Sequence, residues 1–226
     1  MAEPMTLNGV IMRTFFLLVL VVGSAGITWN FILDHPKAMM PAILIGALGG
    51  LACAVFTAFK PRAAAISGSI YCLFEGLAIG GITCYAQAYY PGIAFQAVCL
   101  TFAVLFALLG LYSFRIIRVT RTFQSIIVSA TIGIALVYGL NLILGLFGIP
   151  MGFISGSGPI SIVFSLFVVT IAALNLILDF QFIEQGIENR APRWAEWYAA
   201  FSLMVTLIWL YLEILRLLMK LARRNN

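Results

Sequence analysis

The sequence predicts an all-α integral membrane protein built as a bundle of seven transmembrane helices. Of its 226 residues, 63% are hydrophobic and only 9% are charged. A soluble domain carries roughly 25% charged and about half apolar residues, so this chain lacks the polar surface that a water-soluble globule needs. Its apolar residues form long runs without the alternation that is typical of a transmembrane barrel. The composition therefore excludes a soluble enzyme, a disordered chain and a disulfide-rich secreted domain.

Seven apolar runs are candidate membrane-spanning helices. A hydrocarbon core of ~30 Å needs about 20 apolar residues in a helix. The runs cover residues 8–33, 38–59, 64–89, 91–114, 123–148, 160–186 and 197–222. The first run is too long for a signal peptide and has no small-residue cleavage motif, so we retain it as a helix. We expect residues 1–226 to form a single membrane domain.

Polar, basic or proline-containing segments separate the runs. In chain order they are Asp34–Lys37, Lys60–Arg62, Tyr90–Gly92, Arg115–Arg121, Ile149–Pro159 and Asn189–Glu196. Within the runs, small residues recur at helix-packing spacing, at Gly46 and Gly50 and again at Gly76 and Gly80. Such positions let two helix backbones approach closely, although they could also permit a helix to bend or slide during gating.

The basic residues indicate the orientation, because cytoplasmic loops of membrane proteins carry an excess of Lys and Arg. A cytoplasmic N-terminus places most of them inside: Arg13, Lys60, Arg62, Arg115, Arg118, Arg121, Arg190 and Arg193. Seven full crossings leave Arg216, Lys220, Arg223 and Arg224 outside, so the last segment is either re-entrant or inserts against the rule. Because the charge is concentrated in loops, the net charge of +5 does not indicate a nucleic-acid partner.

Histidine and cysteine usage excludes several chemistries. The single histidine, His35, lies in a predicted loop, whereas haem, zinc-protease and Ser–His chemistry need an imidazole at the reacting centre. Four isolated cysteines, Cys53, Cys72, Cys84 and Cys99, are typical of buried thiols. The acidic residues are too few and too separated for a tight calcium site, which needs six to eight oxygens. We therefore expect no enzyme, no cofactor and no tight metal site.

Four carboxylates lie at or near membrane depth: Glu75, Asp179, Glu184 and Glu213. Each costs at least ~2.5–3.5 kcal/mol at the bilayer centre on insertion scales, which makes it a functional candidate. Glu75 is either a protonated structural hydrogen-bond donor or a carboxylate that lines an ion path. Glu184 lies near the interface, where a solvated or snorkelling end charge is the favoured interpretation. We keep both as candidate pore carboxylates.

Asp179 and Glu213 are a candidate proton-sharing pair. Residues equidistant from the turn of an antiparallel hairpin lie at one depth, and the midpoint of 179 and 213 is residue 196, in the polar connection. The pair would then lie ~10 Å inside one membrane surface. Two carboxyls in a poorly hydrated site share a proton, and losing it leaves like charges that repel. The alternative is that each carboxyl caps or pairs with a neighbour such as Arg216.

Four motifs resemble those of the bacterial Bax inhibitor-1 (transmembrane Bax inhibitor motif) family. They are NLILDFQFIEQG at 175–186, LYLEILRLL at 210–218, FEGL at 74–77 and YPGI at 90–93. The resemblance covers nearly the whole chain from about residue 6. It implies a seven-helix bundle whose last helix is central. The basic-residue distribution predicts a cytoplasmic N-terminus, and the lack of extra domains fits a bacterial inner (plasma) membrane.

The resemblance also implies a pH-sensitive calcium leak, in which two aspartates on the sixth and seventh helices share a proton. A basic residue near the second helix latches this pair in the family. Asp179 matches the first aspartate, whereas Glu213 replaces the second and carries its carboxyl one methylene farther out. Lys60 or Arg62 would be the latch.

We therefore expect a passive calcium (cation) leak channel gated by Asp179 and Glu213, with weak calcium contact at these carboxyls. Its partners would be the lipid bilayer, calcium ions and protons. One alternative is a non-transporting regulator of a membrane-anchored AAA protease or a stress pathway, with the protease as partner. Another is a proton-coupled exchanger, which would use the same carboxyls.

Overall fold

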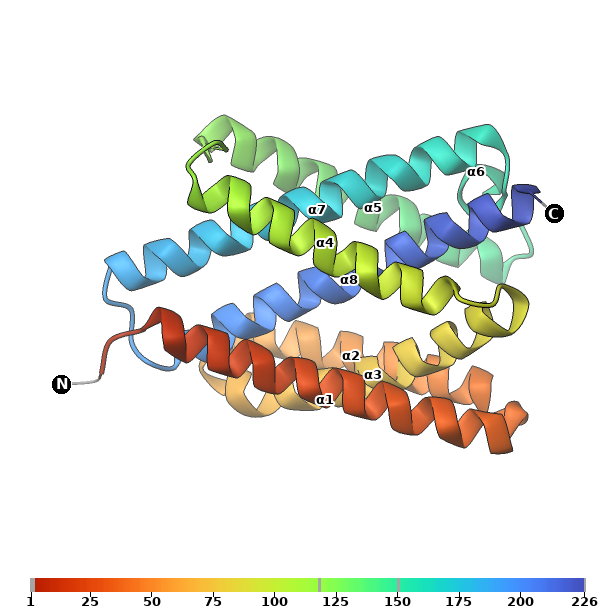
Figure 1. The fold of residues 1–226 in the computed structure, drawn as a ribbon, viewed down its shortest axis with the longest axis horizontal. Coiled ribbons are helices and arrows are strands. Elements are labelled where there is room, and N and C mark those ends of the chain that lie inside the picture. Colours follow the sequence, from red (N-terminus) through yellow and green to blue (C-terminus); the bar gives the residue numbers. More distant parts are fainter. Residues whose placement is uncertain (1–2, 118, 150, 226) are drawn as a thin grey trace. The chain divides into compact units, whose positions relative to one another are not determined.

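A computed structural model describes residues 3–117, 119–149 and 151–225, and Arg118, one of the basic residues that indicate the orientation, lies outside them. Of the described residues, 87% are helical and none forms a strand (Figure 1). Seven helices in this part of the chain are long and apolar enough to cross a membrane. They are α1 (Leu7–Asp34), α2 (Met39–Phe59), α3 (Ala64–Tyr89), α4 (Ile93–Ser113), α5 (Arg121–Leu146), α7 (Pro159–Glu188) and α8 (Ala195–Asn225). The predicted all-α, seven-helix fold class is confirmed.

The helix ends agree with the predicted runs to within a few residues, and local chemistry explains the differences. Gly92, at φ +87°, has a left-handed conformation that favours glycine, so α4 begins after it at Ile93. Thr120 accepts a hydrogen bond from the Phe123 N–H, 3.1 Å, and this N-cap starts α5 at Arg121. The turns before α2 and α3 are the short 3₁₀ helices η1 (Pro36–Ala38) and η2 (Pro61–Ala63). A short helix α6 (Gly152–Ser155) lies in the connection before α7.

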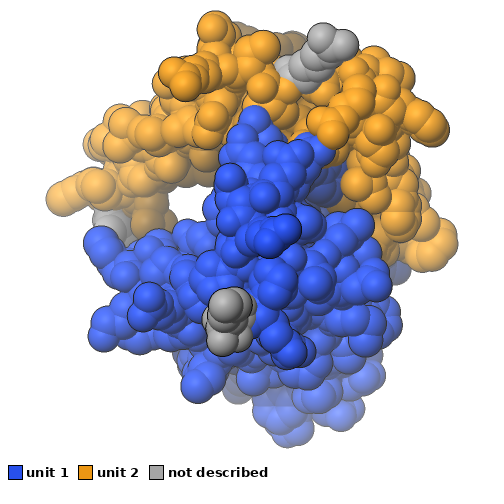
Figure 2. Space-filling model, turned by 90° about the vertical axis from the view of Figure 1, so that its left-hand side faces the viewer, with its two compact units in different colours: residues 1–91, 179–208 blue, residues 92–178, 209–226 orange. Residues whose placement is uncertain are grey.

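The chain forms two compact units, which are coloured separately in Figure 2. Unit 1 contains residues 1–91 and 179–208, and unit 2 contains residues 92–178 and 209–226. Helices α7 and α8 each contribute to both units. Of the seven long helices, α8 has the largest buried share of its apolar window, 61%. The single domain over residues 1–226 stays a prediction.

Small residues bring α2 and α1 against α3 in unit 1. A Cβ at Gly46 would lie 2.5 Å from the Ala78 backbone N, and one at Gly76 would lie 2.5 Å from Ser24 Cβ. Ser24 Oγ also donates to the Leu73 carbonyl of α3, 2.8 Å. The close packing predicted from the glycine spacing is therefore present, because no larger side chain fits at these crossings without displacing a helix.

The chain segment before α1 packs against the α7–α8 connection, also within unit 1. The Met5 N–H donates to the Ala191 carbonyl, 2.7 Å, and Met5 is buried in a cluster with Val10, Ile183 and Ala199. The segment is therefore held by both a backbone hydrogen bond and apolar burial.

Glu196, in the first turn of α8, is the polar centre of this region. Its side chain is 2% exposed, and its Oε1 accepts hydrogen bonds from the Thr6 N–H, 2.8 Å, and the Thr6 hydroxyl, 3.0 Å. Its Oε2 forms an ion pair with Arg13 of α1, whose guanidinium also lies over the Trp197 ring, 5.2 Å from the centroid. The buried charge is tolerated because Arg13 neutralises it and Thr6 donates to Oε1, although Oε2 accepts no hydrogen bond within the described residues.

Unit 2 has an apolar core between α5 and α7. Ile127 and Ile134 of α5 pack with Val168 and Ile171 of α7, and all four are buried. Trp209 of α8 contacts the edge of this core. Burial of these side chains positions the polar residues of the same helices that are described below.

We predict that Glu196→Gln strongly destabilises the protein, whereas Glu3→Gln does not. The first substitution leaves the Arg13 charge without its carboxylate, which costs about 3 kcal/mol for a buried pair. Glu3 pairs with Arg193, but their side chains are 70% and 61% exposed, and exposed pairs contribute only ~0–1 kcal/mol. Chemical unfolding in detergent micelles measures both, and equal effects would show that Glu196 contributes no more than a surface charge.

Candidate functional site

Asp179 is a buried carboxyl in the apolar part of α7. Its side chain is 7% exposed, and its Oδ1 accepts a hydrogen bond of 2.6 Å from the Ser202 hydroxyl of α8. Its Oδ2 has no hydrogen-bond partner among the described residues, although the Thr206 side chain of α8 is also close enough to interact with the carboxyl. A buried carboxyl oxygen without a partner is costly, so it needs a proton, another donor or a cation. Asp179 therefore has the chemistry of a proton or cation site in unit 1.

The connection between α7 and α8 is not centred on residue 196, the midpoint of residues 179 and 213. Helix α7 ends at Glu188 and α8 begins at Ala195, so the turn is centred before residue 196. Asp179 is consequently level with Ser202. Glu213 lies farther along α8, in unit 2. The proton-sharing pair stays a prediction.

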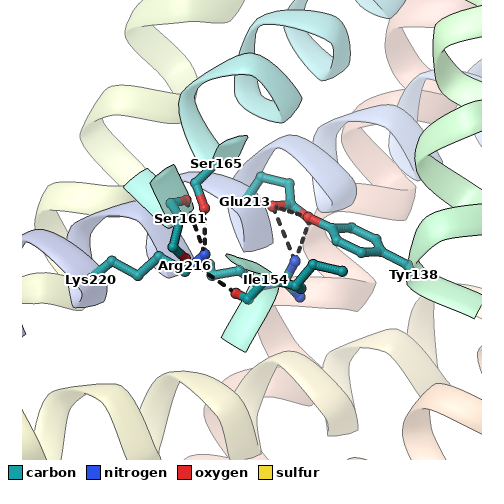
Figure 3. Close-up of polar contacts among 7 residues, drawn as sticks. All are labelled: Tyr138, Ile154, Ser161, Ser165, Glu213, Arg216 and Lys220. Atoms are coloured by element: carbon teal, nitrogen blue, oxygen red, sulfur yellow. Dashed lines mark hydrogen bonds and ion pairs between the residues drawn. The ribbon is translucent and has the colours of Figure 1, made fainter. Parts of the chain in front are cut away.

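Glu213 is the buried carboxyl of unit 2, and it has a cation beside it. Only 2% of its side chain is exposed. Arg216, one turn along α8, lies 2.9 Å from Glu213 Oε1, and the Tyr138 hydroxyl of α5 donates to Oε2, 3.0 Å. The Arg216 guanidinium also lies over the Tyr138 ring, 4.8 Å from its centroid. The contact with Arg216 that the sequence offered as an alternative is therefore present (Figure 3).

Lys220 is a buried ammonium group on the same side of α8 as Glu213 and Arg216. It is 7% exposed, and its Nζ lies 2.8 Å from the Ser165 hydroxyl and 3.3 Å from the Ser161 carbonyl, both on α7 (Figure 3). Ser161 in turn donates to the Gly156 carbonyl, 2.7 Å. Oxygen atoms of α7 thus solvate a charge that would otherwise be too costly to bury.

The remaining predicted site residues belong to unit 1. The Lys60 ammonium lies 5.4 Å from the Phe56 ring centroid, and the Arg62 guanidinium lies 5.9 Å from that of Trp194. Glu75 and Glu184 are both half-buried. The roles of Lys60 or Arg62 as latch, and of Glu75 and Glu184 as pore carboxylates, stay predictions.

Glu75 lies where α3 crosses α2. A Cβ added at Gly50 would lie 2.5 Å from Glu75 Oε1, so this glycine provides the space for the carboxyl. In the described part of the chain, no three His, Cys, Asp or Glu side chains come together as a metal site.

Comparison with protein families gives a match over almost the whole length. A family model described as Bax inhibitor 1 like matches residues 1–223. The chain belongs to this family. The resemblance inferred from the four sequence motifs is therefore confirmed, and the protein is a Bax inhibitor-like, multi-pass membrane protein. Comparison with curated proteins and with solved structures found no significant match.

Three polar residues of this Bax inhibitor-like protein were not identified from the sequence as site residues: Tyr138, Ser202 and Lys220. Lys220 could have been identified from the sequence, because Glu213, Arg216 and Lys220 are spaced i, i+3 and i+7 and so share a face of α8. Tyr138 and Ser202 had no such signal, since a single Tyr or Ser in an apolar helix is common.

We predict that Ser165→Ala destabilises the protein by ~1–3 kcal/mol, because it removes a hydrogen-bond partner from the buried Lys220 ammonium. In a Lys220→Met background the same substitution should cost much less, since no charge then needs the hydroxyl. Chemical unfolding of both single variants and the double variant measures this coupling. Strictly additive effects would show that the Lys220–Ser165 contact contributes nothing to stability.

Proposed function

We propose that this protein is a pH-sensitive cation leak pathway, with calcium as the permeant ion and with Asp179 and Glu213 as its proton-sensing carboxyls. The observation that carries the proposal is the buried Asp179, whose Oδ2 has no partner among the described residues. Membership of the Bax inhibitor 1 like family supports a role in the membrane rather than in water. The distribution of basic residues supports a cytoplasmic N-terminus.

A proton on Asp179 changes what holds α7 to α8. The protonated carboxyl can donate a hydrogen bond, whereas the carboxylate only accepts one, and it already accepts from Ser202. The charged form also attracts a cation to Oδ2 in surroundings of low dielectric constant. Proton binding and cation binding at this carboxyl therefore compete, which links a cation pathway to pH.

Glu213 responds to protons differently because Arg216 lies beside it. While the carboxyl is charged, the ion pair neutralises it and leaves little attraction for a passing cation. Protonation releases Arg216, whose side chain is 39% exposed and whose charge then repels cations. Glu213 thus acts through a resident cation, whereas Asp179 contacts the permeant ion directly.

The test is calcium flux into dye-loaded proteoliposomes across about pH 5 to 8. A single titrating carboxyl changes its ratio of protonated to charged form by at most tenfold per pH unit. We expect wild-type flux to depend on pH and Asp179→Asn to lose most of that dependence. Glu213→Gln should shift the profile through Arg216. Glu3→Gln, which changes an exposed carboxylate, is the matched control and should retain the wild-type profile.

The double variant Asp179→Asn/Glu213→Gln shows whether the two carboxyls share a proton. If they do, each single variant already removes the shared proton, and the double variant adds little. Independent carboxyls give additive shifts of the flux profile. A wild-type flux that equals that of protein-free liposomes at every pH would reject the leak pathway and favour the regulator of a membrane protease.

A further inference from the structure

An apolar groove lies between α2 and α3 in unit 1. It has a volume of about 410 Å³, within the range of ~300–1,000 Å³ for small-molecule pockets. Its lining residues come from the last two turns of α2, the end of η2 and the first turns of α3: Ala52, Cys53, Phe56, Ala63, Ile66, Ser67 and Ile70. The groove is thus located close to one end of two membrane-spanning helices.

The one hydroxyl in the lining does not make the groove polar. Ser67 is 6% exposed, and its Oγ lies 2.7 Å from the Thr57 hydroxyl and 3.0 Å from the Ala63 carbonyl. Its hydrogen-bonding capacity is therefore used within the α2–α3 packing. The groove offers an occupant apolar contact and no buried polar partner, which suits a hydrocarbon chain.

Two exposed basic residues stand at the end of this groove. Lys60 Nζ lies 5.4 Å from the ring centroid of Phe56, which is itself a lining residue. Arg62 precedes the lining residue Ala63 and contacts Trp194 with its guanidinium. Among the described residues neither Lys60 nor Arg62 forms an ion pair, so both positive charges are available to a ligand.

The start of α3 adds positive potential at the same place. Its N-cap is Ala63, and no side chain caps it. The positive end of the helix dipole therefore lies at the turn that carries Lys60 and Arg62, and such ends favour anions. The turn separates two membrane-spanning helices, so an anion there meets the protein at the membrane surface.

We propose that this groove binds an anionic phospholipid, with one acyl chain between α2 and α3 and the phosphate at Lys60 and Arg62. An apolar groove with two cations at its surface end favours that lipid class over a zwitterionic one, whose own positive group weakens the attraction of its phosphate. The basic-residue distribution assigns this turn to the cytoplasmic side, whose leaflet carries the anionic lipids. The inference does not depend on the leak function.

The test is thermal unfolding of the purified full chain in a neutral detergent, with added phosphatidylglycerol or phosphatidylcholine of identical acyl chains. We expect phosphatidylglycerol to raise the unfolding midpoint by about 3 °C more than phosphatidylcholine, since a ligand of the folded state stabilises it. Lys60→Gln/Arg62→Gln should abolish the difference. Lys37→Gln, at the equivalent Pro-Lys turn before α2, is the matched control and should retain it.

Two further variants test the contribution of the lipid headgroup separately from that of the acyl chain. Ala52→Phe, which fills the groove, should lose the phosphatidylglycerol effect although both basic residues remain. The double variant Lys60→Arg/Arg62→Lys keeps both positive charges and should keep the larger shift with phosphatidylglycerol than with phosphatidylcholine. Equal shifts with both lipids in the wild type, full retention in Ala52→Phe, or an equal shift with glycerol 1-phosphate alone would each overturn the proposal.

Discussion

The cost of burying charge in a low-dielectric environment is the constraint on which the rest of this structure depends. Glu196 is paired with Arg13 and Thr6, and Glu213 with Arg216 and Tyr138. Each of these carboxyls has a cation beside it, which compensates for its burial. Asp179 differs, because among the described residues it forms no ion pair and its Oδ2 has no hydrogen-bond partner, while Oδ1 accepts from Ser202. That incomplete compensation distinguishes a candidate functional carboxyl from structural ones.

Most of the fold could be predicted from the sequence, because a bilayer imposes a simple length requirement on each helix. The run 64–89 coincides with α3, and the glycine spacing predicted close helix packing, which α2 and α3 show at Gly46. The first residue of each helix was less predictable, because it depends on N-caps such as Thr120. A cap selects one starting position over its neighbours by about the energy of a single hydrogen bond. The division into two units has no sequence signal, since α7 and α8 continue through both.

The candidate site was predicted in part. Asp179 and Glu213 were identified from their cost at membrane depth, and both are buried. Their common depth was inferred from a turn centred on residue 196, but Glu196 is already helical and pairs with Arg13. A polar residue in a predicted connection is expected to be exposed to solvent, so the sequence alone could not show that Glu196 is buried. Partners on distant helices, such as Tyr138, require the three-dimensional packing.

The most direct test of the central claim is infrared difference spectroscopy of the protein in lipid across about pH 5 to 8, following the C=O stretch of protonated carboxyls. The account predicts a band that changes with pH over the same range as calcium flux and that is absent from the Asp179→Asn variant. An unchanged pH-dependent band in Asp179→Asn would contradict the account, because the titrating carboxyl would then lie elsewhere.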